Sequence, residues 1–189
     1  MKIGLYFGSF NPIHIGHLIV ASHVANHTDM QQVWFVVSPQ NPLKSSSVLL
    51  NEYNRLYLVQ LAVEDDLRLK ASDIEFKLPR PSYTIDTLTY LQEKYPQHAF
   101  SIIMGSDGFQ NLPKWKSFEL LVKNFPFIIY KRQGFDVNDT WQANVHILNA
   151  PLLQISATTI RENIKTGKTI RYLVPDKVRE EIEQNRYYK

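Results

Sequence analysis

The chain has 189 residues, a length that suits one domain with a sizeable core. It contains no cysteine, which excludes disulfides and cysteine-ligated metals, and no apolar run long enough to cross a membrane. Its formal net charge of +3 is spread along the chain, without the dense Lys/Arg stripe that is typical of nucleic-acid binding. We therefore expect a single domain over residues 1–189 that is cytoplasmic and binds neither membranes nor nucleic acid.

The first elements are a buried strand over residues 2–7, a loop over residues 8–14 and a helix over residues 15–26. Strands and helices alternate along the rest of the chain. The pattern predicts strands over 33–37, 69–74, 99–104, 125–130 and 145–148, and helices over 51–64, 84–94, 156–165 and 178–185.

This alternation predicts the fold class. Strands that alternate with helices favour a parallel sheet covered on both faces, joined by right-handed crossovers. We expect a Rossmann-like, doubly wound α/β fold with a small helical part at the C-terminus. In such folds ligands bind beyond the carboxyl ends of the strands.

The loop after the first strand carries a motif of chemical interest, Gly8-Ser9-Phe10-Asn11-Pro12-Ile13-His14-Ile15-Gly16-His17. A loop that opens a helix presents backbone N–H groups and the positive end of the helix dipole, which suits phosphate. Gly8 and Gly16 leave room for a ligand to approach the backbone. His14 and His17 are three residues apart, so both can face one phosphate group and donate hydrogen bonds to its charge.

Other interpretations of this loop exist. A histidine near a helix start is commonly a capping or surface residue, and a pair of histidines is too small a ligand set for a metal without a third residue. The Gly-x-Gly-x-x-Gly fingerprint of dinucleotide-binding loops is absent. The combined spacing of Gly, Phe, Pro and His is more specific than any single residue in it.

A late helix offers a second candidate site for phosphate. In Ile155-Ser156-Ala157-Thr158-Thr159-Ile160-Arg161, Ser156 is a natural N-cap, and Thr158 and Arg161 are i, i+3 neighbours. A helix start with hydroxyl groups and an arginine suits a triphosphate. A plain capped helix is the alternative, and the first motif favours the functional interpretation.

Together these segments resemble the HxGH nucleotidyltransferase superfamily, and within it the nicotinate-mononucleotide adenylyltransferases, over nearly the whole chain. The late helix is similar to the family's Ile-Ser-x-Thr-x-Ile-Arg motif, with Ala157 where the family often has Ser. Arg132-Gln133-Gly134 resembles Arg-Pro-Gly, with Gln133 in place of Pro. Class I aminoacyl-tRNA synthetases share the His-Ile-Gly-His string, but they are much longer and carry a Lys-Met-Ser-Lys-Ser loop that this chain lacks.

The resemblance implies transfer of AMP from ATP to nicotinate mononucleotide, giving deamido-NAD and pyrophosphate. It implies Mg²⁺ bound through the ATP phosphates and no metal held by protein ligands, and it leaves a homodimer open. The catalytic residues it implies are His14, His17, Lys44 and Arg161. The further ATP-binding residues are Gly8, Ser9, Phe10, Gly105, Asp107, Ser156 and Thr158, and the residues for the mononucleotide are Lys44, Tyr83, Thr84, Trp115 and Arg132.

Three alternatives remain at this stage. The chain could adenylylate nicotinamide mononucleotide or phosphopantetheine, although the Gly-Ser-Phe-Asn-Pro segment and Trp115 disfavour the pantetheine substrate. It could also be a nucleotide-binding sensor without turnover. Intact His14, His17, Lys44 and Arg161 argue against the sensor.

Overall fold

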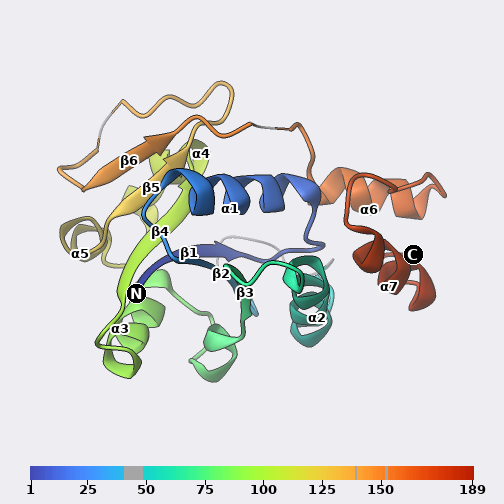
Figure 1. The fold of residues 1–189 in the computed structure, drawn as a ribbon, viewed down its shortest axis with the longest axis horizontal. Helices are drawn as coiled ribbons and strands as arrows, with labels where there is room; N and C mark the ends of the chain where they lie inside the picture. The colour runs from blue at the N-terminus through green and yellow to red at the C-terminus, as the bar shows by residue number, and fades with distance from the viewer. Residues whose placement is uncertain (41–48, 139, 152) are drawn as a thin grey trace.

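A computed structural model describes residues 1–40, 49–138, 140–151 and 153–189. Its centre is a sheet of six strands, all parallel, in the order β3-β2-β1-β4-β5-β6 (Figure 1). The strands are β1 (Lys2–Gly8), β2 (Gln32–Val37), β3 (Leu69–Ser72), β4 (Ala99–Gly105), β5 (Phe127–Tyr130) and β6 (Val145–Leu148). The predicted Rossmann-like fold is confirmed.

Helices cover both faces of this sheet, and their bounds are α1 (Ile15–His27), α2 (Glu52–Val63), α3 (Thr84–Lys94), α4 (Ser106–Gln110), α5 (Phe118–Asn124), α6 (Ala157–Lys165) and α7 (Asp176–Gln184). On one face, Val24 of α1 and Val59 of α2 belong to the same buried cluster. On the other face, Leu91 of α3 and Leu121 of α5 share a second cluster. The strands have buried side chains on both faces, as parallel sheets require.

The direction of the strand order reverses at β1, whose neighbours are β2 and β4. The crossovers from β1 lead outward to β2 and β3, and the later strands β4, β5 and β6 lie on the other side. The segments after β1 and β4 therefore lead to helices on opposite faces of the sheet, α1 and α4, and ligands bind in such sheets at the crevice between two such connections. Gly8 ends β1 at the predicted first loop, and Gly105 ends β4 immediately before α4.

The C-terminal helices lie beside the start of α1. Figure 1 shows α6 and α7 together at one end of the molecule, next to the end of α1 where that helix begins. The N–H group of Ile15 donates to the carbonyl of Leu173 at 2.9 Å, and α7 packs against α2. The predicted helical part at the C-terminus is thus confirmed, and it is held against the first loop.

Several boundaries differ from prediction. The strand predicted to reach Ile74 ends at Ser72, because Ile74 begins a 3-10 helix, η1 (Ile74–Lys77). The helices α4 and α5 and the 3-10 helix η2 (Leu112–Lys114) were not predicted, since elements this short carry less than two turns of periodicity. No helix in the described ranges is long and apolar enough to cross a membrane.

Candidate active site

The two histidines of the first loop lie against each other at the start of α1. His14 is the N-cap residue of α1, and its ring stacks on that of His17 with centroids 3.6 Å apart. The backbone N–H of His14 donates to Nδ1 of His17 at 3.3 Å. Both imidazoles therefore share one face at the helix start, as their spacing predicts.

The loop before them is strained and well packed. Phe10 has φ +44°, a left-handed conformation that is uncommon outside glycine, yet its side chain is buried. Its ring meets those of Tyr6, His17 and Phe35 with centroids 5.8, 5.1 and 5.4 Å away. The aromatic packing therefore holds the loop in a conformation that its backbone alone would not favour.

His14 is neutral at physiological pH. Only 6% of the residue is exposed, and this burial, together with the nearby positive charge of Arg132, lowers its pKa to about 4. A neutral imidazole keeps one N–H donor, so His14 can hydrogen-bond to a phosphate oxygen without a counter-charge.

This pKa predicts how stability depends on pH. Below pH 6.5, the ordinary pKa, the imidazole of His14 binds a proton in the unfolded chain but stays neutral in the folded protein. The free energy of unfolding therefore falls as the pH drops from about 6.5 to about 4. The loss is roughly 2–3 kcal/mol. In urea titrations at about pH 7 and about pH 4.5, His14→Asn, a neutral N-cap, should lose less stability than the wild type. An equal loss in both proteins would show that His14 ionises freely.

A cavity of about 520 Å³ adjoins the two imidazoles, and we call it the histidine cavity. Its walls come from β1, α1, the segment after β5 and the segment before α6. They comprise Tyr6, His14, Gly16, His17, Val20, Tyr130, Arg132, Gln133, Phe135, Leu153, Gln154, Ile155 and Ser156. The first loop and the late helix, more than a hundred residues apart in sequence, thus face one space.

Arg132 is fixed in this cavity by several contacts. Its Nη2 donates to the hydroxyl of Tyr130 at 3.2 Å, its Nε lies 3.3 Å from Oδ1 of Asp107, and its backbone N–H donates to Oγ of Ser106 at 2.9 Å. A Cβ on Gly105 would collide with this ion pair, so the two side chains would have to shift to admit another residue there. Asp107 does not cap α4, because Gly105 is the N-cap residue.

The late helix joins the first loop through Arg161. Nη1 of Arg161 donates to the backbone carbonyl of Asn11 at 2.7 Å, and Nη2 donates to Oγ1 of Thr158 at 3.2 Å. Oγ of Ser156 accepts the N–H of Thr159 at 3.1 Å, which confirms the predicted N-cap. The two predicted phosphate-binding segments are therefore in direct contact.

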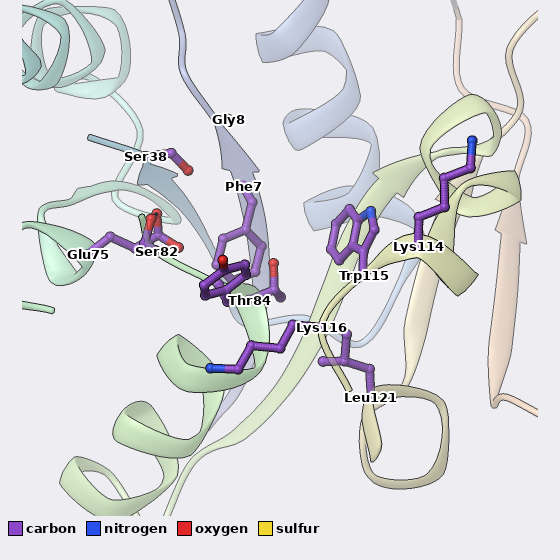
Figure 2. Close-up of a pocket in the computed structure, with 11 residues that line it drawn as sticks. Phe7, Gly8, Ser38, Glu75, Ser82, Thr84, Lys114, Trp115, Lys116 and Leu121 are labelled. Atoms are coloured by element: carbon purple, nitrogen blue, oxygen red, sulfur yellow. Dashed lines mark hydrogen bonds between the residues drawn. The ribbon is translucent and has the colours of Figure 1, made fainter. Parts of the chain in front are cut away.

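A second cavity, of about 330 Å³, lies on the other side of the end of β1 and contains Trp115, so we call it the tryptophan cavity. Figure 2 shows the indole of Trp115 facing Phe7 across this space, while Lys114 extends away. Trp115 is half-buried between two exposed lysines, Lys114 and Lys116. The cavity is lined by Phe7, Gly8, Ser38, Glu75, Ser82, Tyr83, Thr84, Lys114, Trp115, Lys116 and Leu121.

The start of α3 faces the tryptophan cavity. Tyr83 is its N-cap residue, and no side chain among the described residues caps the helix. The hydroxyl of Ser82 donates to Glu75 and so does not cap the helix. The first N–H groups of α3 therefore remain available for an anion.

Glu75 is a buried residue of this cavity that sequence reasoning missed. Its carboxylate accepts hydrogen bonds from the hydroxyls of Ser82 at 2.7 Å and Thr87 at 2.9 Å, and so ties η1 to the start of α3. Burial raises its pKa, and the bound hydroxyls oppose that effect. Only its unusual position in an apolar stretch, Ile74-Glu75-Phe76, could have pointed to it.

The predicted site residues fall into three groups. His14, His17, Arg132 and Ser156 line the histidine cavity, and Gly8, Tyr83, Thr84 and Trp115 line the tryptophan cavity. Ser9, Phe10, Gly105, Asp107, Thr158 and Arg161 line neither but support or flank their walls. Lys44 lies outside the described residues.

Comparisons with known proteins agree with this geometry. Residues 5–163 match the model of the cytidylyltransferase-like family. Proteins of Flavobacterium psychrophilum and Flavobacterium johnsoniae, both named probable nicotinate-nucleotide adenylyltransferase, are 53% and 50% identical to this chain, and each match covers 100% of both chains.

A solved structure shows the same fold. The nicotinic acid mononucleotide adenylyltransferase of Plasmodium falciparum, complexed with NaAD, superposes with a TM-score of 0.84 at 22% identity, covering 99% of this chain and 97% of that one. The family match and the full-length relatives together settle the family. The chain belongs to the nicotinate-nucleotide adenylyltransferase family of cytidylyltransferase-like proteins.

Proposed function

We propose that this protein transfers AMP from ATP to nicotinate mononucleotide, forming deamido-NAD and pyrophosphate. The observation that carries this proposal is the pair of cavities on either side of the end of β1. One is lined by imidazoles, hydroxyls and an arginine, and the other by an indole and an uncapped helix start. The first suits a polyphosphate and the second a ring that bears an anionic group.

ATP would occupy the histidine cavity. His14 and His17 would donate to its phosphate oxygens, and Ser156, Thr158 and Arg161 would bind the triphosphate from the start of α6. Asp107 would accept a ribose hydroxyl near Gly105, and Arg132, which lines this cavity, would add positive charge. The positive end of α6 and the Arg161 guanidinium both favour the negative charge of the triphosphate.

Nicotinate mononucleotide would occupy the tryptophan cavity. Its ring would stack on Trp115, and its carboxylate would accept N–H groups at Tyr83 and Thr84, where α3 begins. Lys116 lies 4.8 Å from the centre of the Tyr83 ring and 2.8 Å from Asp86, so its charge is already partnered. The ring carboxylate would therefore depend on backbone donors.

The two substrates would react where the cavities approach each other. A phosphate oxygen of the mononucleotide attacks the α-phosphorus of ATP, a new P–O–P bond forms, and the bond to the β-phosphate breaks, releasing pyrophosphate. No protein nucleophile is needed, so the chain contributes positioning and charge stabilisation. Lys44 and Arg161 would neutralise the developing negative charge.

Magnesium would enter with ATP. Within the described ranges, no three side chains of the metal-binding types His, Cys, Asp and Glu come together. The described residues that line the histidine cavity carry imidazoles, hydroxyls, amides and a guanidinium but no carboxylate, the protein ligand through which Mg²⁺ is usually bound. We infer that the ATP phosphates and water would hold the ion, which would supply further neutralisation of charge when bound.

Pyrophosphate release tests this function. The purified protein is mixed with ATP and Mg²⁺, and nicotinate mononucleotide is compared with its amide under the same conditions. We expect rapid release with the acid and a lower kcat/KM with the amide. Equal values would refute recognition of the ring carboxylate, and no release with either would favour a sensor without turnover.

Trp115 offers a separate test of where the mononucleotide binds. We expect Trp115→Ala to weaken mononucleotide binding by about tenfold or more, because stacking on an aromatic ring contributes about 1–3 kcal/mol. ATP binding should change little, since Trp115 does not line the histidine cavity. Calorimetry with each ligand measures both affinities.

The matched control is Trp115→Phe, which keeps an aromatic face. It should retain most of the mononucleotide affinity. An equal loss for ATP and mononucleotide in Trp115→Ala would contradict ring stacking.

A further inference from the structure

A fully buried arginine lies beneath the site. Arg55 of α2 has 0% exposure and lines neither the histidine cavity nor the tryptophan cavity. Four of the five N–H donors of its guanidinium reach backbone carbonyls. Nε donates to Leu50 at 2.7 Å, Nη1 to Ser9 at 2.6 Å and to Ser38 at 2.8 Å, and Nη2 to Pro39 at 3.1 Å.

These carbonyls belong to two different loops. Ser9 is in the loop before His14, whereas Ser38, Pro39 and Leu50 lie in the segment between β2 and α2. Ser38 also lines the tryptophan cavity, so Nη1 of Arg55 joins the first loop to a wall of the proposed mononucleotide site. A single side chain therefore fixes the first loop against Ser38, Pro39 and Leu50.

Asn11 supports the same junction from the other side. Its Oδ1 accepts the N–H of Leu50 at 3.1 Å, and its backbone carbonyl accepts the hydrogen bond from Arg161. The first loop is thus tied to the second loop and to α6 at once. This junction fixes three segments that the proposed reaction uses.

The buried charge is costly to keep. Among the described residues, Arg55 forms no ion pair with a carboxylate, and burial lowers its pKa. A buried cation is expensive unless it is hydrogen-bonded, and here four backbone carbonyls supply those bonds. The planar guanidinium forms a rigid fork that joins these carbonyls, a set of contacts that a lysine cannot reproduce.

We propose that Arg55 is a positioning residue for catalysis: by joining the carbonyl of Ser9 in the first loop to those of Ser38 and Pro39 beside the tryptophan cavity, it sets the distance between the attacking phosphate and the α-phosphorus of ATP. This inference rests on the proposed function. Because each loop still binds its own ligand without Arg55, the effect falls on kcat and not on either KM. A misplacement of about 1 Å costs about 100-fold in rate.

The test compares Arg55→Lys with Arg68→Lys, a control at an exposed arginine that pairs with Asp66. Lysine keeps the charge, but its single ammonium cannot match the four contacts of the guanidinium. We expect Arg55→Lys to lower kcat by about 100-fold, with both KM values within about threefold of wild type. Arg68→Lys should match the wild type. Amide hydrogen exchange should become faster at Ser38, Gln40, Leu49 and Leu50 of Arg55→Lys but not in α3.

A second variant keeps the proposal testable if Arg55→Lys does not fold, as judged by its thermal unfolding. Asn11→Ala removes the contact to Leu50 without a change in buried charge, and it should lower kcat by about tenfold. A folded Arg55→Lys or Asn11→Ala with wild-type kcat would overturn the role of this junction, as would a loss confined to one KM. An inactive wild type would instead refute the proposed function.

Discussion

Replacing His17 by alanine is expected to lower kcat by about 10²–10³-fold while the protein stays folded. The reason is that a preorganised donor to charge that develops in a transition state has an effect of this size. His17 lines the histidine cavity beside His14, and its Nδ1 accepts the N–H of His14. Pyrophosphate release measures kcat, and thermal unfolding confirms the fold.

His23→Ala is the control, because His23 lies on the same helix with its ring stacked on that of His27 away from both cavities. It should keep the wild-type rate. Near-wild-type turnover in His17→Ala would remove this histidine from the mechanism. A large loss of kcat in His23→Ala would show that the effect of His17→Ala comes from a disturbance of helix α1 as a whole.

Replacing Arg161 by alanine is expected to reduce kcat/KM for ATP by about 100-fold. Its guanidinium holds the start of α6 against the carbonyl of Asn11, and it is one of the charges proposed to stabilise the transferring phosphate. Steady-state kinetics with ATP as the varied substrate gives this value. The KM for the mononucleotide should change less, because Arg161 does not line the tryptophan cavity.

Arg161→Lys and Arg171→Ala complete this experiment. Lysine at 161 keeps the charge but loses the paired donors, so it should recover only part of the activity. Arg171 lies beyond α6 with its guanidinium over the ring of Tyr172, and Arg171→Ala should keep the wild-type kcat/KM for ATP. Full activity in Arg161→Ala would mean that the late helix serves packing alone.

The sequence predicted the sheet and the main helices because their signals are local. Apolar runs such as Val33-Trp34-Phe35-Val36-Val37 and the capping residues Asn51 and Ser156 act within a few residues of their own positions. Helix α5 was not predicted because seven residues are too few to show a helical period. The N-cap of α3 was not predicted because the hydroxyl of Ser82 donates to the carboxylate of Glu75 and does not cap the helix. That second contact exists only in the folded chain.

The residues of the candidate site likewise divide into those with a local sequence signal and those whose role depends on other segments of the chain. Motifs pointed to the histidines, Trp115 and Arg161, because the spacing of those residues matches a family pattern. Of the supporting residues, Glu75 showed only its position in an apolar stretch and Arg55 showed no local signal, since their roles depend on hydroxyls and carbonyls from other segments. The assignment of Arg132 to the mononucleotide stays a prediction, and its side chain lines the histidine cavity beside Tyr130.

A crystal structure with a non-hydrolysable ATP analogue and Mg²⁺ tests the central claim most directly. We predict that the triphosphate contacts His14 and His17 on one side and Ser156 and Arg161 on the other, with the tryptophan cavity still open for the second substrate. A triphosphate bound elsewhere, or touching only one of these two segments, would contradict the account.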